Sequence, residues 1–181
     1  MGPVTKALRR ARRTRSRYEG SASRPLGGYA GAMAAYAVGT AALTVLGRAR
    51  RVRLPERVSV ADTVLLSVAT HKASRLFAKD AVTSPLRAPF TTYSEPAGEA
   101  ELNESVRGHG VRHAVGELVT CPFCLSVWVA TALTAGLVFA PRMTRLVNTM
   151  LTAVAVSDLL QLGYDGSKQL LHAAGAKAND D

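Results

Sequence analysis

The chain has 181 residues, enough for one domain, and carries 23 Lys and Arg against 13 Asp and Glu, for a formal charge of +10. Such a charge suits nucleic acid or an anionic membrane surface. Aromatic residues make up only 6% of the chain and we find no nucleic-acid motif, which argues against nucleic acid as a partner. Two cysteines do not make a disulfide framework.

The basic residues bracket an uncharged run near the N-terminus. Eight of them lie before Pro25, the run covers residues 25–47, and five more lie between Arg48 and Arg57. This pattern indicates a transmembrane helix next to anionic headgroups, and the run is too long for the apolar region of a cleaved signal peptide. We therefore expect a disordered, basic cytoplasmic tail at residues 1–24, and a retained transmembrane helix with a basic hairpin at residues 25–57.

Small residues recur every four positions in this first helix, at Gly27, Gly31, Ala35 and Gly39. In lipid, small residues let two helix backbones approach closely. The stripe predicts a contact between this helix and another helix of the same molecule.

Three further helices are expected within a membrane domain at residues 58–164. Residues 118–140 and 143–164 are long apolar runs, whereas residues 58–77 have a short apolar part that contains Asp62. An apolar part this short suits a re-entrant helix or a span, and we favour a span because Lys72 and Arg75 can extend toward headgroups from its last turn. The fold class is then all-α: an integral membrane bundle of about four transmembrane helices.

The polar segments complete this picture. Residues 79–117 are predicted to be a surface loop with one short amphipathic helix near residues 111–118, and residues 165–181 a polar tail. The predicted location is the plasma membrane, with several passes and the N-terminus in the cytoplasm. Membrane lipids are the expected partners, together with a protein partner or further copies of the chain.

Alternating passes would bring the unusual polar residues to the inner membrane face. Ionisable residues inside a membrane are costly, so they suggest a function. Lys72, Arg75 and Arg87 are candidates to bind an anionic headgroup or a partner, because Arg matches phosphate bidentately. Asp158 is placed to pair with Lys72 or Arg75, and a salt bridge that only orients the bundle explains it equally well. The residues expected to make polar pairs between helices are His71, Asp80 and Asp158.

Cys121 and Cys124 form a C-x-x-C motif at the start of the third apolar run, where Thr120 is a candidate N-cap. A first interpretation is a dithiol redox site, since a helix N-terminus stabilises a thiolate, although no βαβ pattern supports a thioredoxin-like fold. A second is a zinc site that adds His109 and His113. A third is packing, because cysteine behaves as a small apolar residue, and it is slightly favoured.

Two stretches together resemble a known family. HKASRLFAKDAVTSPLRAPF, followed about 30 residues later by GELVTCPFCLSVWVA, is similar to the bacterial membrane family catalogued as domain of unknown function 1360. The resemblance covers residues 58–162 and implies a membrane location without an assigned activity. Its pattern falls on Arg75, Asp80, Pro85, Arg87, Cys121, Pro122, Cys124 and Trp128.

The sequence thus predicts a membrane protein, more readily a binding protein than an enzyme, whose inner-face cluster binds a partner, a lipid headgroup or a metal. The alternative is a membrane thiol-disulfide oxidoreductase, in which Cys121 is the nucleophile and Cys124 resolves the mixed disulfide.

Overall fold

The computed structural model describes residues 25–180, with the backbone alone for 173–180, together with residues 2, 5–6, 9–10, 13–14 and 17–18. The expected disorder of the basic tail falls largely on residues outside the described ones. The elements are helices α2 (Leu26–Ala49), α3 (Val60–Ala78) and α4 (Ser84–Arg87), strands β1 (Thr91–Gly98) and β2 (Glu101–Val106), and helices α5 (Val111–Thr120), α6 (Pro122–Phe139) and α7 (Pro141–Asp180).

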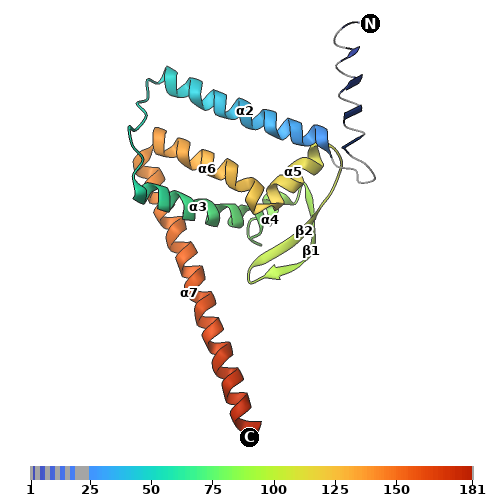
Figure 1. Cartoon of the computed structure of the whole chain (residues 1–181). Helices are drawn as coiled ribbons and strands as arrows, with labels where there is room; N and C mark the ends of the chain where they lie inside the picture. Colours follow the sequence, from blue (N-terminus) through green and yellow to red (C-terminus); the bar gives the residue numbers. More distant parts are fainter. Residues whose placement is uncertain are drawn as a thin grey trace.

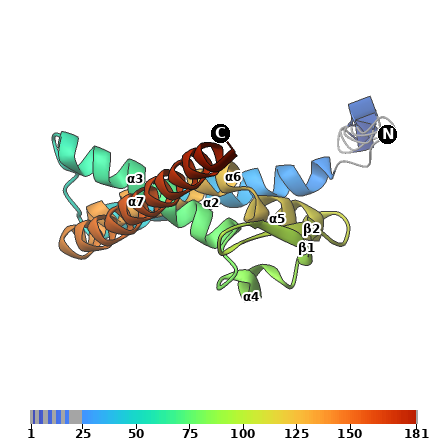
Figure 2. The ribbon, with the colours of Figure 1, turned by 90° about the horizontal axis from the view of Figure 1, so that it is seen from below.

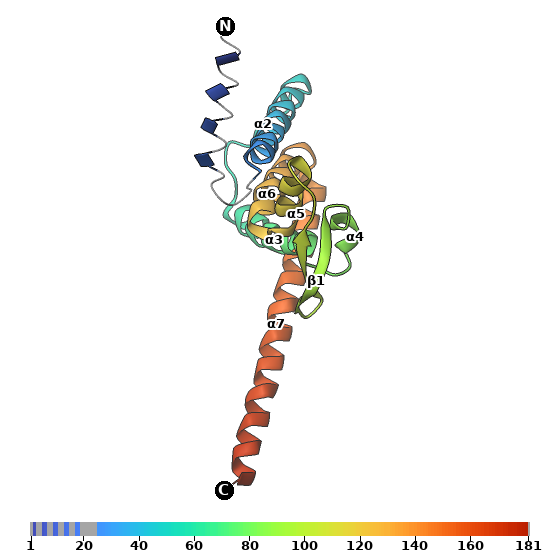
Figure 3. The ribbon, with the colours of Figure 1, turned by 90° about the vertical axis from the view of Figure 1, so that its right-hand side faces the viewer.

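Four long helices form the body of the molecule. Helices α2, α6 and α3 lie beside one another, with α2 and α6 running away from the cap end and α3 running back toward it, while α7 starts beside α3 and extends far beyond it to the C-terminus (Figures 1 and 3). Helix α3 packs against both α6 and α7. Helix α7 continues through residues 165–180, where the sequence suggested a polar tail.

Three helices are long and apolar enough to cross a membrane: Leu26–Ala49, Pro122–Phe139 and Pro141–His172. They match three of the four predicted spans. The fourth predicted span, α3, forms a helix of 19 residues but does not meet that standard among the described residues, because it carries Asp62, Lys72 and Arg75.

Large apolar side chains lie outside and small ones lie inside. Met33 is 74% exposed and Leu160 is 69% exposed, whereas the buried apolar side chains of the described residues are, apart from Pro25, all alanines, such as Ala69 and Ala73 of α3. Helices that associate in lipid pack through small residues, since lipid already surrounds large apolar side chains favourably. This distribution suits a chain surrounded by lipid.

A polar cap, made of α4, β1, β2 and α5, covers the end of the bundle at which α3 finishes and α6 begins (Figures 1 and 2). The amphipathic helix predicted near residues 111–118 is confirmed as α5. The rest of the predicted loop contains an antiparallel hairpin, in which Thr91 pairs with Val106 and Gly98 with Glu101. The hairpin corrects the all-α expectation, and its physical basis is the set of ion pairs described below.

The small-residue stripe of α2 does not make the predicted contact. A Cβ atom added at Gly27, Gly31 or Gly39 would meet no atom within 4 Å. The close approach occurs at Gly28, where an added Cβ would lie 2.6 Å from Ala114 Cβ. Helix α2 therefore contacts α5 through the adjacent position, and the stripe faces outward.

Candidate functional site

Arg87 organises the cap from inside. It is 1% exposed, and its Nε donates to Glu104 Oε2 of β2 at 2.5 Å. Its Nη1 donates to Phe77 O at 2.9 Å and Thr83 Oγ1 at 2.8 Å, and its Nη2 donates to Asp80 O at 3.0 Å. This corrects the expectation that Arg87 binds a headgroup, because burial leaves it only partners within the chain. Its four donors instead hold β2 against the end of α3.

Arg75 and Asp80 also contact the hairpin. Arg75 makes a bidentate pair with Glu101, at 3.0 Å from Nε and 2.5 Å from Nη2. Asp80 forms a backbone bridge with Glu101, and its carboxylate accepts the N–H of Val82 at 2.9 Å. Arg75 remains partly exposed, but its guanidinium fork is already occupied by a carboxylate.

Two ion pairs join α3 to α7. Lys72 Nζ lies 2.6 Å from Asp158 Oδ2, which is one of the two pairings suggested by the sequence. At the opposite end of the bundle, Arg145 donates to both oxygens of Asp62, at 2.8 and 3.0 Å. The two helices run in the same direction, so each pair fixes their relative register at one end. His71 is exposed and makes no polar pair with the described residues.

The cysteines line a separate groove of about 520 Å³ between α2, α5 and α6. Cys121 is half-buried, Cys124 is exposed, and both are free thiols. Cys121 is the N-cap of α6, and its Sγ accepts the N–H of Cys124 at 3.3 Å. Tyr29 of α2 donates to Glu117 of α5 at 2.5 Å beside them. The lining residues come from α2, α5 and α6: Tyr29, Ala32, Ala114, Glu117, Leu118, Thr120, Cys121 and Cys124.

Thr120 is not the N-cap of α6, as the sequence had suggested. Helix α5 extends to Thr120, whose hydroxyl donates back to Gly116 O at 2.9 Å. Cys121 is therefore the N-cap residue of α6, and Pro122 lies in the first turn of α6 as expected.

The histidines of the predicted zinc site do not join the two cysteines in a ligand set among the described residues. His109 is exposed in the loop before α5, and His113 Nε2 lies 3.5 Å from Glu117 Oε1. Within the described part of the chain, no three His, Cys, Asp or Glu side chains come close enough together to hold a metal ion. His109, His113, Cys121 and Cys124 are therefore not assembled as one ligand set.

The inner-face cluster predicted from sequence thus divides into two parts. One part contains the ion-paired Lys72, Arg75, Arg87 and Asp158 together with Asp80, which accepts hydrogen bonds from Arg87 and Val82, and a thiol part contains Cys121 and Cys124. Sequence reasoning missed the partners Glu101, Glu104, Asp62 and Arg145. The available signal for Glu101 and Glu104 was that the polar segment is rich in carboxylates and the end of α3 carries cations, but only the hairpin register decides which of them pair.

These features define a mostly helical protein that has three helices long and apolar enough to cross a membrane, an ion-paired polar cap and a cysteine-lined groove. The chain belongs to the family described as Protein of unknown function (DUF1360), which it matches over residues 65–164, so the resemblance inferred from sequence is confirmed. It is also similar to the Bacillus subtilis (strain 168) protein named "Sporulation protein YjcA", with 30% identity over 101 residues that cover 54% of this chain and 86% of that protein. No solved structure matches the chain. Helix α2 lies outside the family match.

Proposed function

We propose that this chain is a multi-pass protein of the plasma membrane, with its N-terminus and polar cap on the cytoplasmic side. The three apolar helices and the outward-facing large side chains support membrane insertion. Eight basic residues before Pro25 against five from Arg48 to Arg57 favour a cytoplasmic N-terminus. Helix α3 is about 28 Å long at ~1.5 Å per residue and packs against α6 and α7, and its Asp62 and Lys72 pair with Arg145 and Asp158 of α7.

Membrane insertion is tested by extraction with alkaline carbonate. An integral protein stays in the membrane pellet until detergent is added, because its apolar helices cannot leave lipid for water. Release by carbonate alone would reject the membrane assignment.

The groove at Cys121 and Cys124 is the proposed binding site for a partner protein. The single observation that carries this proposal is that Lys72, Arg75 and Arg87 all have carboxylate partners within the chain, whereas the groove is open and presents two free thiols. Its walls are partly apolar and it lies where α2 and α6 enter the membrane. These features suit an apolar segment of another membrane protein. A partner that acts in sporulation is the first to test, given the name of the Bacillus relative.

Site-specific photo-crosslinking tests this binding site. A photoreactive amino acid is placed at Ala32, which lines the groove, and at Met33 as the matched control, which is exposed on another face of α2. A discrete protein adduct from Ala32 and none from Met33 is the expected result. An adduct of the mass of two chains would identify a second copy as the occupant, and equal crosslinking from both positions would reject the groove.

A dithiol oxidoreductase is the second candidate function, favoured by the position of Cys121 at the N-terminus of α6. A helix N-terminus stabilises a thiolate, and C-x-x-C motifs exploit this effect. The Cys121 thiolate would attack a partner disulfide and release one partner thiolate. Cys124 would then displace the second, leaving a Cys121–Cys124 disulfide and a partner reduced by two electrons. A cytoplasmic dithiol would reduce the pair again.

Mixed-disulfide trapping distinguishes this candidate from partner binding alone. In Cys124→Ala the resolving thiol is missing, so an oxidoreductase accumulates an adduct at Cys121 that reducing agent removes. Cys121→Ala is the matched control and should trap nothing. If neither variant traps an adduct, the redox candidate is rejected, whereas photo-crosslinking at Ala32 still decides the binding proposal.

A further inference from the structure

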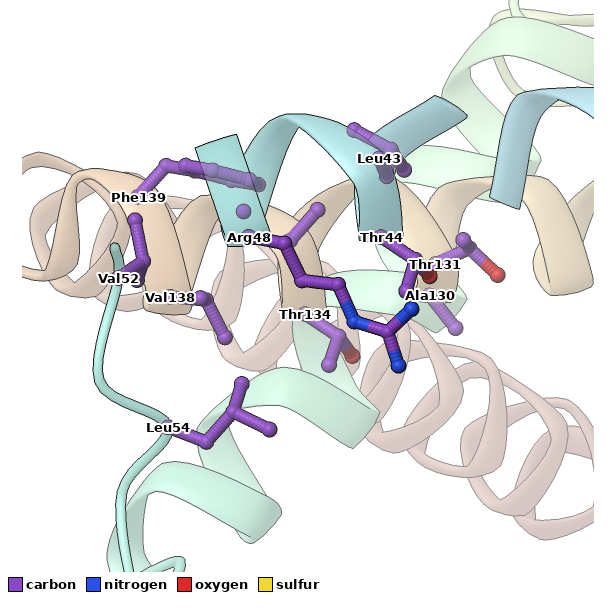
Figure 4. Close-up of a pocket in the computed structure, with 12 residues that line it drawn as sticks. Leu43, Thr44, Arg48, Val52, Leu54, Ala130, Thr131, Thr134, Val138 and Phe139 are labelled. Atoms are coloured by element: carbon purple, nitrogen blue, oxygen red, sulfur yellow. The ribbon is translucent and has the colours of Figure 1, made fainter. Parts of the chain in front are cut away.

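A second groove lies at the end of the bundle opposite the cap. It has a volume of about 530 Å³ and separates the last turns of α2 from the second half of α6 (Figure 4). Its walls include Leu43, Val138 and Phe139, and the loop after α2 adds Val52 and Leu54. These side chains give the groove a mostly hydrocarbon surface.

Contacts between α2 and α6 close the groove at each of its two ends. At the end nearer the cap, the rings of Tyr36 and Trp128 meet edge to face with centroids 5.3 Å apart, and Tyr36 Oη lies 2.8 Å from Thr131 Oγ1. At the end farther from the cap, a Cβ atom added at Gly47 would lie 3.7 Å from Phe139 Cζ. The groove is therefore bounded at both ends by contacts between α2 and α6.

Arg48 extends into this groove and has no partner there. Figure 4 shows its guanidinium reaching across toward Thr131 and Thr134 of α6. Among the described residues its guanidinium makes no hydrogen bond or ion pair, unlike those of Arg75, Arg87 and Arg145, which each have a carboxylate. The Arg48 guanidinium is a cation with five N–H donors beside an apolar, lipid-facing groove. A ligand that matches both features has an anionic group and an apolar chain.

We infer that this groove binds an anionic glycerophospholipid, with its phosphate at Arg48 and an acyl chain along the apolar walls. Arg presents a planar fork that matches phosphate bidentately, and Thr134 adds a hydroxyl on the facing helix. The site lies in the leaflet opposite the cap, because α2 runs from the cap toward Arg48. The inference rests on the proposed membrane insertion but not on the cysteine groove. It also gives a binding role to α2, which the family match does not include.

Native mass spectrometry of the detergent-solubilised full-length chain tests this site. The probes are dioleoyl phosphatidylglycerol, dioleoyl phosphatidylcholine, and glycerol 3-phosphate, which is an anion without acyl chains. We expect phosphatidylglycerol to bind in preference to the other two. Arg48→Gln should lower that preference about fivefold, as expected for one basic side chain near an anionic lipid. Arg53→Gln removes the same charge from the loop that follows Arg48, at a position outside the groove, and should keep the preference.

A second variant tests the apolar part of the groove. Ala135→Leu narrows the groove without changing charge and should also weaken phosphatidylglycerol binding, while circular dichroism checks that both variants remain folded. Equal losses in Arg48→Gln and Arg53→Gln would overturn the site in favour of diffuse surface charge. Equal binding of phosphatidylcholine or glycerol 3-phosphate, or a dimer that excludes lipid, would overturn it too. Release by carbonate would instead reject the membrane assignment, and the lipid site with it.

Discussion

Arg87 and Glu104 form a buried ion pair that joins α4 to β2. The Arg87 Nε–Glu104 Oε2 distance is 2.5 Å, and the two side chains are 1% and 5% exposed. The Arg75–Glu101 pair joins α3 to the same strand, but Arg75 is 46% exposed. Two ion pairs of similar length therefore differ in burial, and burial should decide how much each one matters for stability.

Arg87→Ala should destabilise the chain strongly. The substitution leaves the Glu104 carboxylate buried without its partner and removes the donors to Phe77 O, Thr83 Oγ1 and Asp80 O. Breaking a buried pair in this way costs about 3–5 kcal/mol. Unfolding of the detergent-solubilised chain in urea, followed by circular dichroism, measures the change.

Arg75→Ala is the matched control for this prediction. It removes an Arg–Glu pair from the same strand, but at an exposed position where such pairs contribute about 0–1 kcal/mol. Arg87→Met combined with Glu104→Leu should recover much of the lost stability, because no unpaired charge stays buried. Equal effects of Arg87→Ala and Arg75→Ala would contradict the structural role of Arg87.

The Lys72–Asp158 pair should show energetic coupling between α3 and α7. Lys72→Met leaves Asp158 without its cation, and Asp158→Asn leaves Lys72 without its anion, so each should destabilise the bundle. The double variant should cost less than the sum, with a coupling of about 0.5–3 kcal/mol, because neither charge is then left alone. Urea unfolding of the four proteins measures this cycle. Additive effects would show that the contact does not stabilise the bundle.

The long helices could be predicted from the sequence because each depends on a local property. An uncharged run of membrane length is visible without any partner, and so is the amphipathic pattern of α5. The approach of Lys72 to Asp158 could also be anticipated, since it follows from alternating helix directions alone.

The hairpin could not be predicted in the same way. Its stability depends on pairs such as Arg87–Glu104 and Arg75–Glu101, whose members lie 17 and 26 residues apart and meet only in one strand register. The sequence predicts the wrong N-cap for α6 for a related reason. Thr120 has a typical capping side chain, but it belongs to the last turn of α5, so Cys121 takes that position.

Cys121 should stabilise α6 through its side chain, whereas Cys124 contributes only its backbone N–H to the cap. Cys121→Ala removes the acceptor and should cost about 1 kcal/mol, while Cys121→Ser keeps an acceptor and should cost less. Cys124→Ala is the matched control and should have little effect on the cap. Urea unfolding under reducing conditions compares the three variants. A larger loss in Cys124→Ala would show that packing at the groove outweighs the cap.

The loop after α2 and the tip of the hairpin should lie on opposite sides of the membrane. In a Cys121→Ser/Cys124→Ser background, a membrane-impermeant maleimide should label Arg53→Cys in intact cells and Glu99→Cys only after permeabilisation. Both positions are exposed, and α3 separates them along the chain. Labelling of both positions from the same side would show that α3 is re-entrant.

Gly28 should be required for the contact between α2 and α5. A Cβ added there would lie 2.6 Å from Ala114 Cβ and 2.8 Å from Gly110 O, so Gly28→Val must push α2 away from the cap. Overpacking of this kind costs about 1–3 kcal/mol, measured as a lower urea midpoint. Gly31→Val is the matched control on the same helix, since a Cβ at Gly31 meets no atom within 4 Å. Because Tyr29 and Ala32 belong to the same segment, Gly28→Val should also change alkylation of Cys124, whereas Gly31→Val should not. If Gly31→Val is the more damaging substitution, the small-residue stripe, and not Gly28, makes the helix contact in the membrane.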